Sequence, residues 1–291
     1  MSSKSPAKGN PAHWIADRVL RGLIACLLVL PYRTRLRLMG ATMRYVLGPV
    51  TGYQQRAEEN LKLVYPDLPS SKRRSIARDC CDNFGRTFIE NYSWREFGAV
   101  MAECPPKGEG MAALQNAVAS GRPVLFVSGH FGNHEAPRQS LFAAGYEVAF
   151  LYRAMQNPYF NRHYAQTMTH WGGPAFVQGS PGTKDFIQHL AKGGLAALLF
   201  DVSARGASIP FLGHPARTAL STAEFALAHD ALVLPYFATR QPDGIHFDID
   251  IQAPVLHSTP IEMVTEMTSR LEAKIAEHPA QWFWVHKRWK A

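Results

Sequence analysis

The chain has 291 residues and a formal net charge of +8, from 31 Lys and Arg against 23 Asp and Glu. This length can bury one sizeable core, which favours a single folded domain over two. The positive charge suits an anionic membrane or an acidic protein partner, and the lack of a recognition motif argues against nucleic acid. No Cys-x-x-Cys pair is present, so a structural zinc site is not expected. We expect reduced, buried thiols at all four cysteines: Cys26, Cys80, Cys81 and Cys104.

Residues 1–12 have the composition of a disordered tail. The most apolar segment of the chain follows at residues 23–30, where it ends at Pro31. A membrane-spanning helix needs about 20 predominantly apolar residues, so this segment is short for a span. Two interpretations remain open, namely a buried core helix and a membrane anchor that lies in the interface or spans marginally.

The residues around this segment favour contact with a membrane. Trp14 and Tyr32 are suitable interfacial anchors, and the preceding Arg18 and Arg21 can extend their charges to an interface. No small-residue cleavage site follows, so a cleaved signal peptide is not expected. Further arginines suit anionic lipid on a cytoplasmic surface: Arg33, Arg35, Arg37 and Arg44.

Beyond residue 120, strand-like and helix-like segments alternate, which predicts an α/β fold with a mixed central sheet flanked by helices. The helix-like stretches include residues 157–171 and 183–192. The last two strands are joined by a Gln-Pro-Asp-Gly turn at residues 241–244 and are expected to form a hairpin. The expected strands are residues 123–128, 147–153, 174–178, 195–201, 231–240 and 245–252.

The most informative stretch is residues 121–137, in which an apolar strand leads into a glycine-flanked turn that carries His130. Ligands of open α/β sheets bind at such strand ends. Glu135 lies five residues later, and its side chain can meet His130 only if the backbone turns at Gly129 and Gly132. An imidazole held by a carboxylate is a general base for a hydroxyl. The alternative is a surface histidine followed by a glutamate in the first turn of a helix.

Three further residues are candidates for substrate binding. Arg153 ends the second strand and is suited to a substrate phosphate or a thioester oxygen, or to a surface ion pair. Asp201 ends the fourth and is suited to a sugar hydroxyl, to Arg205, or to capping a turn. Arg217 follows the apolar stretch at residues 209–216.

Other chemistries lack their motifs. There is no Gly-x-Ser-x-Gly nucleophile elbow, and residues 179–184 lack the spacing of a phosphate-binding P-loop. His130 and His134 could share a zinc ion, but the second histidine of His-Glu-x-x-His is absent, so no metal or other cofactor is expected.

Several segments resemble, in the same order, the bacterial lipid A late acyltransferases of the lauroyl/myristoyl type, within the lysophospholipid acyltransferase superfamily. The stretch Gly-His-Phe-Gly-Asn-His-Glu is similar to the family's His-x4-acid motif. His134 stands where the family commonly has Trp, and Val202 where it commonly has Gln after the Asp. The other matching segments are residues 56–68, 83–91, 150–162, 198–240 and 278–290.

The resemblance implies an acyltransferase domain over residues 46–291, behind a helical anchor region at residues 13–45. The implied enzyme sits at the cytoplasmic face of the inner membrane. It transfers a fatty acyl chain from acyl carrier protein, or coenzyme A, to a hydroxyl of a lipid A precursor. His130 would remove the hydroxyl proton, and Glu135 would orient the imidazole and stabilise its cation. Arg153, Asp201 and the loop before Arg217 would contact substrate.

Three other functions remain open. The same chemistry could act on a lysophospholipid or another glycolipid. A membrane-bound thioesterase would use water in place of the acceptor alcohol. A protein that has kept the scaffold without the activity is disfavoured by the intact His130 and Glu135.

Overall fold

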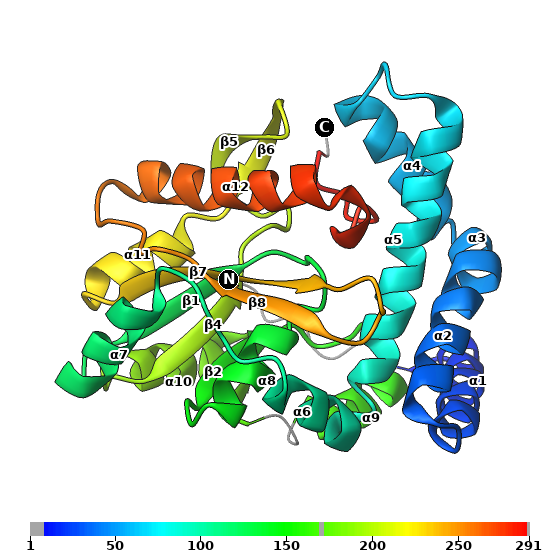
Figure 1. The fold of residues 1–291 in the computed structure, drawn as a ribbon, viewed down its shortest axis with the longest axis horizontal. Coiled ribbons are helices and arrows are strands. Elements are labelled where there is room, and N and C mark those ends of the chain that lie inside the picture. Colours follow the sequence, from blue (N-terminus) through cyan, green and yellow to red (C-terminus); the bar gives the residue numbers. More distant parts are fainter. Residues whose placement is uncertain (1–8, 169–171, 290–291) are drawn as a thin grey trace.

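Six strands form one central sheet, in the order β3-β2-β4-β1-β7-β8. The computed structural model describes residues 9–168 and 172–289, and Figure 1 shows helices on both faces of this sheet. The first five strands in that order are parallel, and β8 pairs antiparallel with β7. The mixed sheet and the hairpin through residues 241–244 are therefore confirmed. The strands are β1 (Val124–Ser128), β2 (Val148–Tyr152), β3 (Ala175–Val177), β4 (Leu195–Leu199), β7 (Leu232–Arg240) and β8 (Phe247–Ile251).

The central strands are buried on both faces, which is why they read as continuous apolar runs. Successive side chains of β1 point to opposite faces. Leu125 and Val127 belong to one hydrophobic cluster, and Val124 and Phe126 belong to another. The first cluster includes side chains of α10 (Ser180–Ala191), α11 (Ser221–Ala228) and α12 (Pro260–Glu277). The second includes side chains of α6 (Trp94–Ala102), α7 (Met111–Ser120) and α8 (Ala136–Ala143).

A layer of helices from the N-terminal part of the chain stands beside the sheet (Figure 1). The longest of them is α5 (Ser70–Glu90), which packs against α2 and α4. A third hydrophobic cluster, which includes Ile24, Leu36 and Ile89, joins α1, α2 and α5. The other helices of this layer are α1 (Pro11–Leu28), α2 (Tyr32–Thr42), a π-helical turn (Met43–Leu47), α3 (Gly48–Val50) and α4 (Tyr53–Val64).

Several element boundaries differ from those expected. The helix expected at residues 157–171 is α9 (Pro158–Met168), which begins one residue later, and residues 169–171 lie outside the described residues. The helix expected at residues 183–192 begins earlier, at Ser180. The apolar stretch before Arg217 is a two-stranded hairpin, β5 (Ala207–Phe211) and β6 (His214–Thr218), instead of a loop.

The disordered tail expected at residues 1–12 ends earlier than expected, because residues 11 and 12 are helical. Helix α1 begins at Pro11, because the side chain of Asn10 accepts a hydrogen bond from the backbone nitrogen of His13 and caps the helix. The rest of the predicted tail, residues 1–8, lies outside the described residues. The division into an anchor region and an acyltransferase domain at residue 45 stays a prediction.

The N-terminal helices do not present all their charged and aromatic residues outward. Asp17 and Arg35 are buried, and Arg35 forms an ion pair with Glu96 instead of facing solvent. Tyr32 is only partly exposed, and burial followed by the charge of Glu90 raises the pKa of its phenol above the ordinary range. Among the described residues, no helix has both the length and the apolar character that a membrane crossing requires. The expected anchor helix is therefore not confirmed.

Candidate active site

His130 lies in the turn directly after β1, and Asp201 lies just beyond the end of the neighbouring strand β4. Because parallel strands end at the same edge of a sheet, the two side chains meet there. Nδ1 of His130 lies 2.7 Å from Oδ1 of Asp201. The backbone nitrogen of His130 donates to Oδ2 of the same carboxylate over 2.8 Å. A carboxylate thus holds the imidazole, but it belongs to Asp201.

Asp201 is 1% exposed and accepts a third hydrogen bond, from the indole Nε1 of Trp282, over 2.9 Å. Burial by itself raises the pKa of the Asp201 carboxyl. The charge of His130 and the hydrogen bonds from it outweigh that effect and lower the pKa well below its ordinary value. Asp201 is therefore ionised at neutral pH. Its partner at Nδ1 leaves Nε2 of His130 as the nitrogen that can take a proton from a substrate.

Two further histidines surround the His130 ring. The ring centroid of His134 lies 5.3 Å away, and that of His286 lies 4.4 Å away with its edge toward the ring. Burial, followed by the charge of His130, lowers the pKa of His134 to about 4 and that of His286 to about 3. Both neighbours are therefore neutral at neutral pH, and they add no positive charge beside the candidate base.

Glu135 does not occupy the position expected of it. Its Oε2 accepts from Nε of Arg138 over 2.9 Å and lies 2.8 Å from Nη2 of the same arginine. Its other oxygen, Oε1, lies 4.0 Å from Nε2 of His134. The physical reason is the start of α8: Glu135 is the residue before that helix and pairs with an arginine in its first turn, whereas His130 stays at the strand end. The carboxylate at Nδ1 of His130 is therefore that of Asp201, and a catalytic role of Glu135 stays a prediction.

A cavity of about 740 Å³ opens beside His130, between the strand ends, α5 and the C-terminal segment. Arg153 is exposed and lines it, together with Lys287, as expected of a substrate-binding residue. Arg217 lies on β6, exposed, and is not among the lining residues. The cavity also has an apolar lining that includes Phe84, Phe88, Phe150, Tyr164, Leu198 and Phe283.

Sequence reasoning missed Trp282 and His286 as parts of this site. Packing is part of what the C-terminal aromatic residues do, since Trp282 and Trp284 are fully buried. The indole nitrogen of Trp282 and the ring of His286 also reach the His130–Asp201 pair. No local spacing signals this, because the segment reaches the site through a bridge between Phe131 and Trp282.

One group among the described residues has the composition of a metal site. Ligand atoms of His130, Asp201 and His286 lie within 4.8 Å of one another. Two histidines and a carboxylate suit zinc, although the His130–Asp201 contact is equally that of an oriented base. No cysteine joins this group. The cysteines are free, with Cys80, Cys81 and Cys104 buried and Cys26 exposed, against the expectation that all four are buried.

Comparison with known proteins gives the family. The family model described as bacterial lipid A biosynthesis acyltransferase matches residues 2–291. The chain is 22% identical to lipid A biosynthesis acyltransferase 2 of Shigella flexneri, over 96% of this chain and 90% of that protein. It is 24% identical to the lipid A biosynthesis lauroyltransferase of Escherichia coli strain K12, over 98% of this chain and 94% of that protein. A single family model thus spans nearly the whole chain, and the protein is an acyltransferase that belongs to the bacterial lipid A biosynthesis acyltransferase family.

Proposed function

We propose that the protein transfers a fatty acyl chain from a thioester of acyl carrier protein, or of coenzyme A, to a hydroxyl of a lipid A precursor. The observation that carries this proposal is the His130–Asp201 pair, which stands at a cavity with an apolar lining. An oriented imidazole is what activation of an alcohol requires, and an apolar cavity is what a hydrocarbon chain requires. Family membership supports the acyl transfer itself.

In this mechanism, Nε2 of His130 takes the proton of the acceptor hydroxyl while the oxygen attacks the thioester carbonyl. Asp201 fixes the ring tautomer through Nδ1 and stabilises the imidazolium that forms. When the tetrahedral intermediate collapses, the carbon–sulfur bond breaks and the imidazolium returns its proton to the departing thiol. An ester and a free thiol are the products. The sequence of steps needs no covalent enzyme intermediate and no metal ion.

Other residues assist this reaction in the proposal. Arg153 and Lys287, at the cavity, are suited to a phosphate of the donor or of the acceptor. Glu135 acts as a positioning residue, because its ion pair with Arg138 ties the end of the His130 turn to α8. The net positive charge of the chain favours an acidic carrier protein as the donor.

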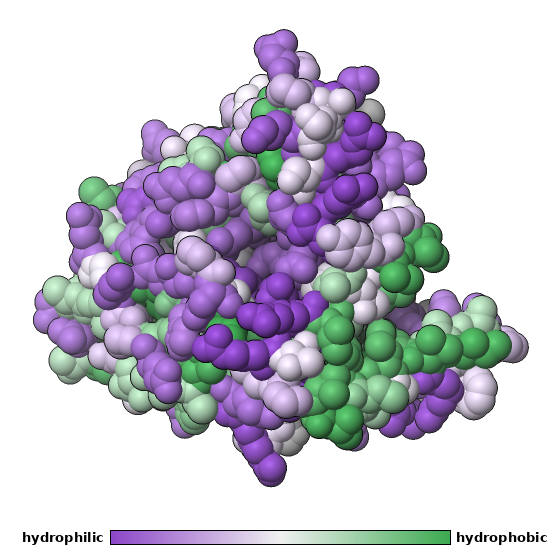
Figure 2. Space-filling model, turned by 45° about the vertical axis from the view of Figure 1, so that its right-hand side comes forward, coloured by the Kyte–Doolittle hydropathy of each residue, from purple (hydrophilic) through white to green (hydrophobic). Residues whose placement is uncertain are grey.

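We also infer that α1–α3 rest on an anionic membrane surface, at the cytoplasmic face of the inner membrane. Figure 2 shows hydrophobic residues gathered on this side of the molecule. Ile15 and Val19 on α1, and Val29 directly after its last residue, are exposed apolar side chains, at 57%, 67% and 82% exposure. Arg33 and Arg37 are exposed nearby. Exposed apolar side chains beside arginines are typical of a helix that lies in the interface of an anionic bilayer.

Product analysis tests the proposed reaction. Purified protein is incubated with acyl carrier protein thioester, with coenzyme A thioester and with each acceptor in turn, and the products are identified by mass spectrometry. Acylated lipid A precursor supports the proposal. Release of free fatty acid at the same rate with and without acceptor would make the protein a thioesterase instead. Acylation of only a lysophospholipid or another glycolipid would show that the acceptor is that lipid and not a lipid A precursor.

A further inference from the structure

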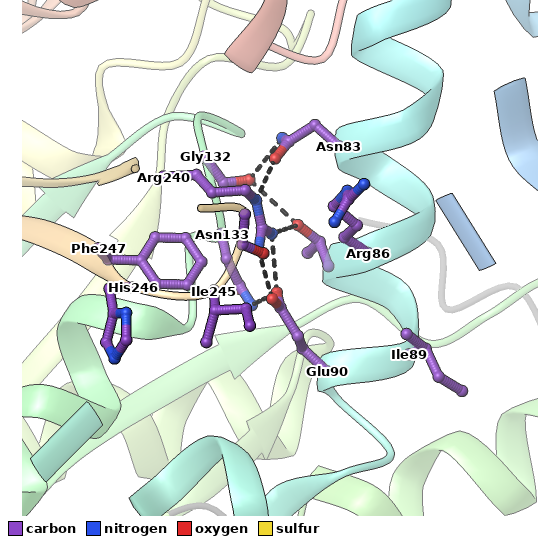
Figure 3. Close-up of polar contacts among 12 residues, drawn as sticks. Asn83, Arg86, Ile89, Glu90, Gly132, Asn133, Arg240, Ile245, His246 and Phe247 are labelled. Atoms are coloured by element: carbon purple, nitrogen blue, oxygen red, sulfur yellow. Dashed lines mark hydrogen bonds and ion pairs between the residues drawn. The ribbon is translucent and has the colours of Figure 1, made fainter. Parts of the chain in front are cut away.

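A buried ion pair lies between α5 and β7, beside Gly132 and Asn133 of the turn that follows His130 (Figure 3). Glu90, the last residue of α5, pairs through both carboxylate oxygens with Arg240, the last residue of β7. One of these contacts, from Nη2 of Arg240 to Oε2 of Glu90, measures 2.8 Å. Glu90 is fully buried and Arg240 is 9% exposed. Neither residue lines the cavity.

Several further hydrogen bonds connect the pair to the turn itself. Oε2 of Glu90 accepts from the side-chain amide of Asn133 over 2.8 Å. Nε of Arg240 donates to Asn83, whose amide nitrogen in turn donates to the backbone carbonyl of Gly132 over 2.9 Å. Thr87 forms a parallel bridge, since its hydroxyl accepts from Arg240 and donates to the same carbonyl. Hydrogen bonds thus connect both charged side chains to Gly132 and Asn133, the two residues that follow Phe131.

The turn has no room to move on its other sides. Gly132 has a φ of +56°, and a Cβ there would lie 1.8 Å from the carbonyl oxygen of Ala238. Its backbone nitrogen donates to the carbonyl of Gln281 over 2.9 Å. The side chain of Gln281 in turn forms two hydrogen bonds with the backbone of Arg240. Arg240 therefore joins α5, the C-terminal segment and the turn.

We propose that the Glu90–Arg240 pair and Asn133 position the turn that carries His130, an inference that rests on the proposed role of His130 as the base. Stability alone is a weak explanation for the pair, because a buried ion pair often contributes no more than apolar residues of similar volume. A base displaced by about 1 Å can lose a factor of 10² in rate. Glu90 and Arg240 do not line the cavity, so they would act through the turn as positioning residues.

The test separates positioning from folding by removing both charges at once. The single variants Glu90→Met and Arg240→Met each leave a buried charge unpaired and should lower the melting temperature. The double variant should recover much of that loss, because no unpaired charge remains. Its kcat should nevertheless stay about 10- to 100-fold below that of the unaltered protein, with KM little changed. Hydrogen exchange of the peptide that covers residues 129–136 should be faster in the double variant.

Two further variants test whether the loss of kcat comes from the position of the turn. Arg35→Met removes another buried arginine, whose bonds lead to Glu96, Leu30 and Ser93 instead of to the turn, and should lower the melting temperature without lowering kcat. Asn133→Ala keeps the ion pair and removes its direct link to the turn, together with the hydrogen bond that Oδ1 of Asn133 accepts from the backbone nitrogen of Glu135, and should lower kcat. Wild-type kcat and exchange in a stable double variant, or wild-type kcat in Asn133→Ala, would overturn the inference. If the unaltered protein transfers no acyl group, the proposed function fails, and the exchange measurement still tests the positioning of the turn.

Discussion

Trp282 donates a hydrogen bond from its indole nitrogen to Oδ2 of Asp201, the oxygen that also receives the backbone N–H of His130. The carboxylate that holds the candidate base is therefore itself held by the C-terminal segment. Three donors on one carboxylate leave it few alternative positions. The orientation of His130 is set by residues from three separate parts of the chain.

Replacing His130 with alanine should lower the turnover of acyl transfer by about 10²- to 10⁴-fold, the usual contribution of a general base. The fold should survive, because the ring is partly exposed in a turn and adds little packing. His134→Ala should cost much less, since His134 makes no contact with Asp201 comparable to that of His130. Steady-state kinetics and melting curves of both purified variants check this, and equal, complete losses would contradict the assignment of His130 as the sole base.

Asp201→Asn should reduce turnover more than Glu135→Gln does. An amide at position 201 offers a single acceptor oxygen and places N–H groups against Nδ1, which favours the wrong tautomer of His130. At position 135 the amide oxygen can still accept from Arg138. We expect a loss of about 10²- to 10⁴-fold for Asp201→Asn, and about tenfold or less for Glu135→Gln, a positioning change. The opposite ranking of kcat would return the orienting role to Glu135.

Stability should fall as the pH drops from about 6.5 toward 4. His134 and His286 have pKa values of about 4 and about 3 in the folded protein, against about 6.5 in an unfolded chain. The unfolded chain binds these protons first, so each histidine removes up to about 1.4 kcal/mol of stability per pH unit in this window. Urea unfolding at pH 7, 6 and 5 measures the slope. His134→Asn should flatten it, and an unchanged slope would contradict a neutral, buried His134.

Replacing Ile15, Val19 and Val29 together with serine should weaken binding to anionic vesicles. The three side chains are exposed and apolar, two on α1 and one directly after it, and their burial in the membrane interface is lost with the substitution. Leu256→Ser is the matched control, because Leu256 is 77% exposed but lies between β8 and α12. Flotation with phosphatidylglycerol vesicles measures the bound fraction. Equal binding of the triple variant and the unaltered protein would place the membrane contact elsewhere.

Acyl transfer should survive removal of metal ions. Nδ1 of His130 already has Asp201 as its partner, and the proposed proton transfer uses Nε2. Protein is dialysed against EDTA, its metal content is measured by mass spectrometry, and acyl transfer is then assayed. Activity that disappears with the metal and returns with zinc would make His130, Asp201 and His286 metal ligands and end the general-base mechanism.

The sequence predicted the parts of the fold that depend on local pattern. Residues 123–128 and 195–201 read as buried strands, and both are strands of the parallel sheet. The Gln-Pro-Asp-Gly turn predicted the β7–β8 hairpin, because turn residues specify that connection locally. The hairpin β5–β6 was not predicted, since its prolines, Pro210 and Pro215, hide the strand pattern.

The sequence predicted residues of the candidate site but not how they pair. His130 and Asp201 were each singled out, but 71 positions separate them, and their pairing depends on β1 lying beside β4. Spacing along the chain favoured Glu135 because it is close in sequence. The direction of the Glu135 side chain is set by the start of α8, where it pairs with Arg138. The roles of Trp282 and His286 depend on the C-terminal segment folding back onto the His130 turn, and no periodic pattern in the sequence predicts that contact.

The bridge between Phe131 and Trp282 has a consequence for synthesis on the ribosome. The turn that carries His130 leaves the ribosome well before the segment that completes it, by on the order of ten seconds at bacterial elongation rates. During that interval Asp201 lacks its indole donor, and Gly132 lacks the carbonyl of Gln281. The proposed active site is therefore incomplete on the nascent chain, although the N-terminal helices with the proposed membrane-contacting residues have already been synthesised.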